Sequence, residues 1–169
     1  MTKARVRLII MAAVSRNGII GRNGRLPWHL SKELRLFRYL TMGRTLLMGR
    51  KTFESLPSTL PGRRLWVLST QPPKPTTHAQ FFPSIESALE AAVNEKLDVL
   101  YVIGGGKVFQ QLMPLADEMR ISKILAHVEG DVRFPSYALA DWHLRFEQYF
   151  PADLRSPLPF LHQHWTRIA

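Results

Sequence analysis

The sequence predicts an α/β fold with a mixed, mainly parallel central sheet, helices on both faces and antiparallel strands at the carboxyl end. Short, continuous apolar runs alternate with segments of helical character as far as residue 119. Such runs are typical of strands buried on both faces of a parallel sheet, and the alternation is typical of helices that cover both faces. Beyond residue 119, three strand-like segments follow, with no helix between the last two. They therefore predict antiparallel strands that complete the sheet.

The predicted elements follow one another in a simple order. Strands are expected at residues 6–14, 45–48, 65–69 and 99–103, because these stretches are continuous and rich in branched or large apolar residues. Helices are expected after Ser31, at residues 51–56, from residue 84 to about 94, and from Gly105 onward. The final strands are expected at residues 119–128, 142–149 and 160–168. Pro72, Pro73 and Pro75 predict one exposed loop.

Glu33 occupies an unexpected place in the helix predicted after Ser31, which is itself a good N-cap residue. Apolar residues recur there at helical spacing, namely Leu30, Leu34, Phe37 and Leu40. Glu33 falls in the same stripe, although a carboxylate turned toward an apolar interior is costly unless something compensates it. A glutamate in the first turn also favours the helix dipole. That explanation accounts for the residue type but not for its place in the stripe.

Composition and charge limit the possible classes of protein. The 169 residues are enough for a single domain, residues 1–169, with a substantial core. The chain has no cysteine, which excludes disulfides and thiolate chemistry and makes a cytoplasmic location the default. Its longest apolar run, residues 8–14, is too short to span a bilayer. The net charge of +10 comes from cations spread along the chain, which favours an anionic ligand over nucleic acid.

Three segments are expected at the carboxyl ends of strands, where open α/β sheets bind ligands. Residues 102–108, VIGGGKV, run from a strand through three glycines into a helix, a pattern typical of pyrophosphate binding or of a tight turn. Residues 48–54, MGRKTFE, open another helix with two cations and a hydroxyl, which suit phosphate or a solvated basic turn. Residues 68–71, LSTQ, offer hydroxyls to phosphate or simply end a strand.

The loop at residues 16–25 contains two Asn-Gly pairs. Asn-Gly usually marks a hairpin turn. A long loop punctuated by glycines beside a cleft is also typical of a lid that closes over a substrate. Both interpretations stay open at this point.

Seven short motifs occur in the order seen in dihydrofolate reductases, namely Ile19-Ile20-Gly21, Leu26-Pro27-Trp28, Glu33 with Phe37, and residues 48–55, 60–63, 103–106 and 129–131. Any single one of these motifs could arise by chance, but seven in the same order are specific for this family. From residue 8 to 135 the sequence resembles the bacterial-type, single-domain members of this family, and the strand-rich tail fits too. The resemblance implies NADPH-dependent reduction of 7,8-dihydrofolate to 5,6,7,8-tetrahydrofolate, which supports one-carbon and thymidylate metabolism.

The resemblance also implies how the site works. The family transfers a hydride from NADPH to the pterin ring while a proton is delivered to N5. Glu33 aligns with the family's active-site carboxylate, which accepts two parallel donors of the pterin as a fork, so that the substrate compensates the buried charge. Arg63 would hold the α-carboxylate of the substrate's glutamate tail. Trp28 would hold a water that bridges to Glu33, and the Ser122 hydroxyl would bond the carboxylate.

Three sets of site residues follow from the resemblance. The catalytic set is Glu33, Trp28 and Leu26. The substrate-binding set is Met11, Ala12, Ala13, Glu33, Leu34, Phe37, Leu56, Leu60, Arg63, Ile103, Phe109 and Ser122. The cofactor-binding set is Ala13, Ile20, Gly21, Gly24, Arg25, Leu26, Gly49, Arg50, Lys51, Thr52, Leu68, Ser69, Thr70, Gly104, Gly105, Gly106, Lys107 and Val108. A cis peptide bond is expected between Gly104 and Gly105, and no metal centre is expected.

Four positions depart from common bacterial patterns. Leu26 stands where Met is frequent, Ser58 where some members have Arg, Lys107 where Arg often follows the glycines, and Phe109 where Tyr is usual. These departures bear on rate, lid kinetics and antifolate affinity, not on the fold or the reaction.

Two other functions compete with this interpretation. The reductase domain of riboflavin biosynthesis shares the fold and uses NADPH on a ribosylated pyrimidine, but Trp28 and Glu33 followed by Phe37 argue against it. The charge of +10 is also compatible with a nucleic-acid-binding protein on a nucleotide-binding scaffold. The favoured interpretation has dihydrofolate as the partner and makes antifolate inhibitors plausible. On this interpretation we expect a monomer that binds neither nucleic acid nor membranes.

Overall fold

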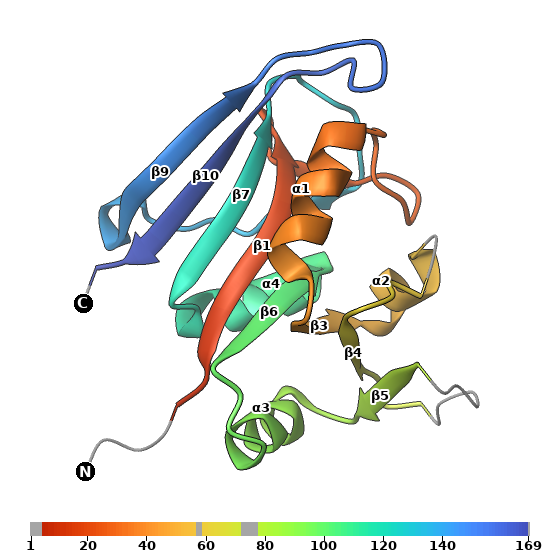
Figure 1. Cartoon of the computed structure of the whole chain (residues 1–169), viewed down its shortest axis with the longest axis vertical. Coiled ribbons are helices and arrows are strands. Elements are labelled where there is room, and N and C mark those ends of the chain that lie inside the picture. Colours follow the sequence, from red (N-terminus) through yellow and green to blue (C-terminus); the bar gives the residue numbers. More distant parts are fainter. Residues whose placement is uncertain (1–4, 57–58, 72–77, 169) are drawn as a thin grey trace.

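The computed structural model describes residues 5–56, 59–71 and 78–168 (Figure 1). Ser58, Pro72, Pro73 and Pro75 lie outside these residues. The strands are β1 (Arg7–Ser15), β2 (Ile19–Gly21), β3 (Thr45–Gly49), β4 (Arg64–Leu68), β5 (Ala79–Phe82), β6 (Val99–Gly104), β7 (Glu118–Ile124), β8 (Val132–Arg133), β9 (Trp142–Phe150) and β10 (Phe160–Arg167). The α-helices are α1 (Ser31–Thr41), α2 (Arg50–Ser55), α3 (Ile85–Asn94) and α4 (Gly106–Leu112). Two short 3-10 helices, η1 (Met113–Leu115) and η2 (Leu139–Asp141), complete the described elements.

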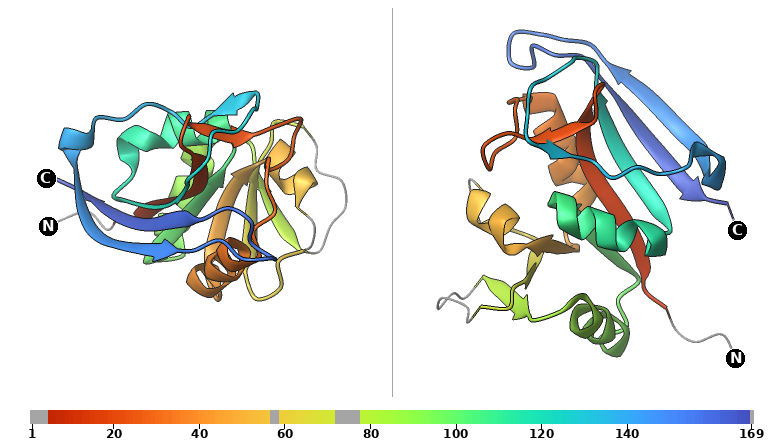
Figure 2. Two further views of the ribbon diagram at one scale, coloured as in Figure 1. Left: turned by 90° about the horizontal axis from the view of Figure 1, so that it is seen from above. Right: turned by 180° about the vertical axis from the view of Figure 1, so that it is seen from behind.

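The main sheet is mixed and mostly parallel, which confirms the predicted fold class. Its eight strands lie in the order β5-β4-β3-β6-β1-β7-β10-β9. All pairs from β5 to β7 are parallel, whereas β10 is antiparallel to both β7 and β9. A second, two-stranded sheet pairs β2 with β8. The predicted antiparallel strands therefore complete one edge of the main sheet (Figures 1 and 2).

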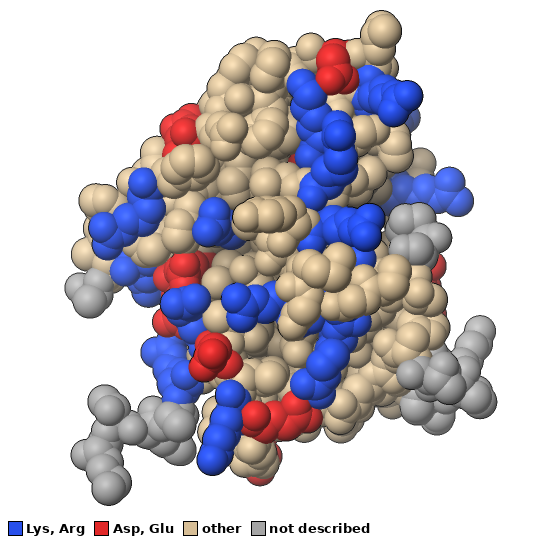
Figure 3. All heavy atoms as spheres, viewed as in Figure 1, with Lys and Arg blue, Asp and Glu red and all other residues tan. Residues whose placement is uncertain are grey.

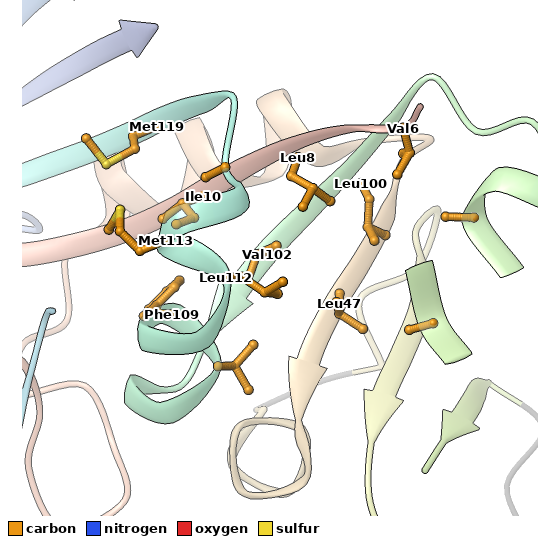
Figure 4. Packing of buried hydrophobic residues seen from close by; sticks show 14 of the residues in the cluster. Val6, Leu8, Ile10, Leu47, Leu100, Val102, Phe109, Leu112, Met113 and Met119 are labelled. Atoms are coloured by element: carbon orange, nitrogen blue, oxygen red, sulfur yellow. The ribbon is translucent and has the colours of Figure 1, made fainter. Parts of the chain in front are cut away.

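Side chains on both faces of β1 are buried, and this explains its continuous apolar run. Leu8 and Ile10 belong to a cluster beneath α3 and α4, which also contains Leu112 (Figure 4). Ile9 and Met11 belong to a second cluster on the other face, beneath α1 and α2. Side chains of a strand alternate between the faces of the sheet, so both faces need a cover. The prediction of helices on both faces is confirmed, with α1 and α4 on opposite sides in Figures 1 and 2.

The start of α1 differs from the prediction that Ser31 is its N-cap. Leu30 is the N-cap, without a side-chain cap among the described residues, and its carbonyl accepts the Leu34 N–H at 3.0 Å. Ser31 is the first helical residue instead. The exposed N–H groups of the first turn find partners far along the chain, because the Lys32 N–H donates to Ser156 Oγ at 3.0 Å. A distant loop thus caps this helix.

Two further differences have local causes. The strand predicted at residues 119–128 ends at Ile124, since the Ala126 N–H turns back to the Ile124 carbonyl at 2.9 Å. The short strands β2, β5 and β8 were not predicted, because two to four residues carry too little periodicity. None of the helices in the described part of the chain is long and apolar enough to cross a membrane.

Replacing a core leucine of the central sheet should destabilise the chain strongly. Leu47 on β3 is fully buried in the cluster beneath α3 and α4, whereas Leu154 is fully exposed. We expect Leu47→Ala to lower the free energy of unfolding by about 2–5 kcal/mol through lost burial and a residual cavity. Chemical denaturation measures this loss, with Leu154→Ala as the control that stays close to the parent. Equal midpoints for the two variants would contradict this account of the core.

Candidate active site

The carboxyl ends of three neighbouring strands bring the predicted ligand-binding segments together. Parallel pairing sets Gly49 at the end of β3 opposite Leu68 at the end of β4. Met48 on β3 lies opposite Gly104 at the end of β6. Because β4, β3 and β6 are adjacent and parallel, the residues that follow them emerge along one edge of the sheet. The three segments singled out in the sequence therefore form one site edge.

The glycines at this edge allow two helix starts to approach each other closely. A Cβ atom at Gly49, the N-cap of α2, would lie 3.3 Å from Val108 Cγ2 of α4. A Cβ at Gly105, the N-cap of α4, would lie 3.3 Å from Thr52 Oγ1 of α2. The expected cis peptide bond between Gly104 and Gly105 is present. A side chain at either glycine would therefore crowd the other helix, and the starts of α2 and α4, each with free backbone N–H groups, lie close together.

Arg50 lies beside residues 68–71, the segment with the Ser69 and Thr70 hydroxyls. This is expected because Arg50 follows β3, and the segment ends the neighbouring strand β4. Its Nη1 donates to Gln71 Oε1 at 2.8 Å and lies 3.8 Å from a Glu54 carboxylate oxygen. The Gln71 N–H donates to Ser69 Oγ at 3.2 Å, so a single residue links Arg50 to Ser69. Gln71 is the last residue of the predicted segment 68–71, and no role was expected for it. The hydrogen bond between Arg50 and Gln71 could not be predicted from the sequence, because the two residues are 21 positions apart.

Glu33 is buried, as its place in the apolar stripe predicts. It is 9 % exposed on the side of α1 that faces the sheet. Burial raises the pKa of Glu33 to about 7, and a hydrogen bond from the Ser122 side chain opposes that rise. Ser122 lies on β7, directly opposite Ala13 of β1. The desolvation of the carboxyl group outweighs its one hydrogen bond, so that the proton is held near neutral pH.

The other predicted substrate residues divide between separate surroundings. Met11, Phe37, Leu56, Leu60 and Ile103 all belong to the cluster beneath α1 and α2. Ala13 and Trp28 pack instead in a third cluster with Leu30, and the buried Trp28 Nε1–H has no partner among the described residues. Leu34 and Leu26 are 40 % and 50 % exposed.

Phe109 and Ala12 lie on the opposite face of the sheet, in the cluster beneath α3 and α4. The Phe109 ring sits beside the glycine turn, since a Cβ at Gly104 would lie 3.2 Å from its Cε2. The structure therefore brings Phe109 next to a predicted cofactor residue, not into the cluster that contains Phe37. Phe109 is buried and Ala12 is half-buried.

Arg63 lies against α1 together with a second cation. Its Nη1 donates to Thr41 Oγ1 at 3.4 Å, and its buried Nε has no hydrogen-bond partner in the described part of the chain. Burial, and secondarily the positive charge of Arg38, lower the pKa of Arg63. Arg38 was not predicted as a site residue. Figure 3 shows Lys and Arg side chains gathered on the face that carries α1.

The loop at residues 16–25 contains a hairpin turn and also packs on a distant segment. Asn23 and Gly24 both have positive φ, 51° and 78°, between the bridged residues Arg22 and Arg25. The Asp131 N–H donates to the Gly21 carbonyl at 3.0 Å, beside the pairing of β2 with β8. The Asn-Gly prediction of a hairpin is confirmed at this pair, and the idea of a lid stays a prediction.

Comparison with known proteins decides the family. The sequence profile of the family described as Dihydrofolate reductase matches residues 7–167. The chain belongs to the dihydrofolate reductase family. The competing riboflavin-pathway interpretation is thereby replaced.

Individual dihydrofolate reductases resemble the chain over most of its length. Dihydrofolate reductase type 3 of Salmonella typhimurium is 36 % identical over 144 residues, 85 % of this chain and 88 % of its own length. Dihydrofolate reductase type 6 of Proteus mirabilis is 35 % identical over 168 residues, 96 % of this chain and 99 % of its own length. A solved dihydrofolate reductase from Enterococcus faecalis, complexed with NADP(H) and RAB-propyl, has a TM-score of 0.87 at 29 % identity. It covers 96 % of this chain, and 97 % of that protein is matched.

Removing the charge of Glu33 should stabilise this dihydrofolate reductase family member at high pH. The carboxyl binds its proton more tightly in the folded chain, with a pKa of about 7, than in the unfolded chain, where the ordinary glutamate pKa of 4.5 applies. Its contribution to stability is therefore fully present below the unfolded pKa and is lost as the pH rises through the folded pKa. Glu33→Gln should stabilise the ligand-free chain by about 2–3 kcal/mol more at about pH 8.5 than at about pH 5.

Chemical denaturation at the two pH values measures this difference. Glu86→Gln, which changes an exposed glutamate in the first turn of α3, is the matched control and should show little dependence on pH. A Glu33→Gln effect that is the same at both pH values would contradict a raised pKa.

Proposed function

We propose that Glu33 is the protein group that carries the proton chemistry when this chain reduces dihydrofolate. The reaction follows from the family: NADPH-dependent reduction of 7,8-dihydrofolate to 5,6,7,8-tetrahydrofolate, an oxidoreductase activity. The single observation that supports the role of Glu33 is its buried carboxyl group, with a pKa raised to about 7. A group with a pKa near the working pH is suited to general acid-base chemistry.

The residues along the site edge fit NADPH. A side chain at Gly49, Gly104 or Gly105 would crowd neighbouring side chains, so only bare backbone fits at these positions. That backbone would offer its N–H groups to a pyrophosphate. Arg50 would meet the phosphate that distinguishes NADPH from NADH, and Ser69 and Thr70 would add hydroxyl donors. Bound NADPH supplies the hydride. The other predicted cofactor residues would line its path along the starts of α2 and α4 and beneath the loop that carries β2.

Glu33 and Arg63 would hold the two polar ends of the substrate. In its ionised form Glu33 accepts two parallel N–H donors of the pterin, and these donors favour the charged carboxylate that burial disfavours. Arg63, with Arg38 beside it, provides positive charge for the carboxylate of the glutamate tail. This placement aligns the pterin with its ring against the apolar residues of the cluster around Phe37.

Glu33 would act on the proton by positioning. Its carboxyl orients the pterin and a water held near the Trp28 Nε1–H, which has no partner within the described part of the chain, so that N5 is protonated before or during hydride transfer. A purely structural role, in which Glu33 only stabilises the first turn of α1, would not explain why its carboxyl group is buried.

We also infer that residues 1–169 act as a single domain and a monomer in the cytoplasm, without nucleic-acid or membrane partners. The absence of cysteine is compatible with a reducing compartment. The scattered positive charges favour a small anionic ligand. Antifolates that present parallel N–H donors would meet Glu33 in the same way as the pterin.

Removing the Arg50 side chain should weaken the preference for NADPH. A charge-assisted bond to the extra phosphate is worth on the order of 1.5–3 kcal/mol, so we expect a preference of roughly tenfold or more in the parent chain. Arg50→Ala should raise the KM for NADPH far more than the KM for NADH. Arg35→Ala removes one exposed cation from α1 and should change neither. Equal effects of Arg50→Ala on both cofactors would show that Arg50 does not read this phosphate.

Glu33→Gln should slow turnover without weakening cofactor binding. The amide keeps the size of the side chain but presents a donor where the pterin also has one, and general acid-base effects are typically worth about 10² to 10⁴ in rate. Steady-state kinetics at neutral pH should show a loss of that order, and lower pH should partly restore the rate as solvent acid protonates N5. The Kd for NADPH should barely change. Near-normal turnover at about pH 7, or failure through lost NADPH binding, would contradict the assignment.

A further inference from the structure

His162 is a buried histidine directly behind the side chain that bonds Glu33. It lies on β10, where antiparallel pairing sets it opposite Ser122 of β7. Only 4 % of the residue is exposed. Its Nδ1 is 3.4 Å from Ser122 Oγ, and its buried Nε2 has no partner among the described residues. Ser122 is also the side chain whose hydrogen bond lowers the pKa of Glu33, so it connects Glu33 on α1 with His162 on β10.

The number of available protons determines which group donates in the hydrogen bonds between His162, Ser122 and Glu33. Ser122 has one hydroxyl proton, and donating it to the ionised Glu33 carboxylate leaves only lone pairs on its oxygen. His162 must then be the donor at Nδ1, which leaves Nε2 as a bare acceptor. The opposite tautomer would bury an N–H without a partner at Nε2, and orphaned buried N–H groups are rarer than orphaned acceptors.

His162 stays neutral in its surroundings. Burial, and secondarily the positive charges of Arg120 on β7 and His164 on β10, lower the pKa of His162 to about 4. On β9 the residue opposite His162 is the uncharged Gln148, and on α1 the carboxyl group of Glu33 is linked to His162 through Ser122. A neutral imidazole can donate only one hydrogen bond, so the Nδ1–H is committed to Ser122.

We propose that His162 is a positioning residue for Glu33: its Nδ1–H holds the Ser122 hydroxyl as a donor to the carboxylate. Hydrogen bonds in a chain polarise one another, so a donor behind Ser122 strengthens the bond that Ser122 gives to Glu33. His162 thereby favours the ionised form of Glu33 and keeps its proton affinity from rising further with burial. This inference rests on the proposed role of Glu33, but the arrangement is a property of the ligand-free chain.

The test is the protonation midpoint of Glu33, followed by NMR of ¹³C-labelled glutamate side chains in the ligand-free, full-length chain. His162→Phe keeps a ring but removes the donor, and should raise the midpoint by about 0.5–1 pH unit. His162→Asn places an amide N–H close to the position of Nδ1 and should restore most of the parent midpoint. His143→Phe, at an exposed histidine on β9, is the control and should leave it unchanged.

A double-mutant cycle with Ser122→Ala tests the route. Ser122→Ala should raise the Glu33 midpoint as well, and adding His162→Phe to it should raise the midpoint no further. If His162→Phe does not fold, His162→Gln replaces it, because its amide reaches toward Nε2 and leaves Nδ1 without a substitute. A folded variant without the Nδ1 donor but with the parent midpoint would overturn the proposal. Equal midpoints for the Asn and Phe variants, or additive effects with Ser122→Ala, would overturn it as well.

These outcomes are separate from those that test the catalytic role. A Glu33→Gln variant with near-normal turnover would remove the function proposed for the carboxyl group, but the midpoint shifts would still be observed. Conversely, unshifted midpoints together with a slow Glu33→Gln variant would leave the catalytic role intact. In that case His162 would be only a buried core residue.

Discussion

The parallel pairing of β1 with both β6 and β7 is the constraint on which the rest of this structure depends. It places β1 at the centre of the sheet, where both of its faces must be covered, so the helices divide into two layers. It also aligns the carboxyl ends of the parallel strands, and therefore the segments that follow them. Ala13 on β1 lies opposite Ser122 on β7, so this pairing also positions the side chain that bonds Glu33.

Within this frame, the energetics of the site are set by the burial of one carboxyl group. Desolvation raises the pKa of Glu33, and the hydrogen bond from Ser122 lowers it; burial is the larger effect. A protein that needed only stability would place an apolar residue there, because the charge is costly without a partner. The cost is understandable if a ligand with paired donors completes the hydrogen bonding of Glu33. Trp28 Nε1 and Arg63 Nε are further buried polar atoms without a hydrogen-bond partner among the residues that the structure describes.

Several features could be predicted from the sequence because their causes are local. Continuous apolar runs indicated the parallel strands, the Asn23-Gly24 pair indicated a turn, and the spacing around Glu33 indicated a buried carboxylate. What could not be predicted depends on pairing between distant segments. The cap of α1 comes from Ser156, and the partner of Ser122 comes from His162, 40 residues later. No periodicity within one segment reveals the register of another.

Glu33 is thus a buried carboxyl group that exchanges its proton near neutral pH. Infrared titration of the ligand-free chain tests it most directly, with the Glu33→Gln spectrum subtracted so that only this carboxyl group contributes. We expect the C=O band of the protonated acid to disappear as the pH rises, with a midpoint of about 7. A midpoint near the ordinary glutamate pKa of about 4.3 would contradict it.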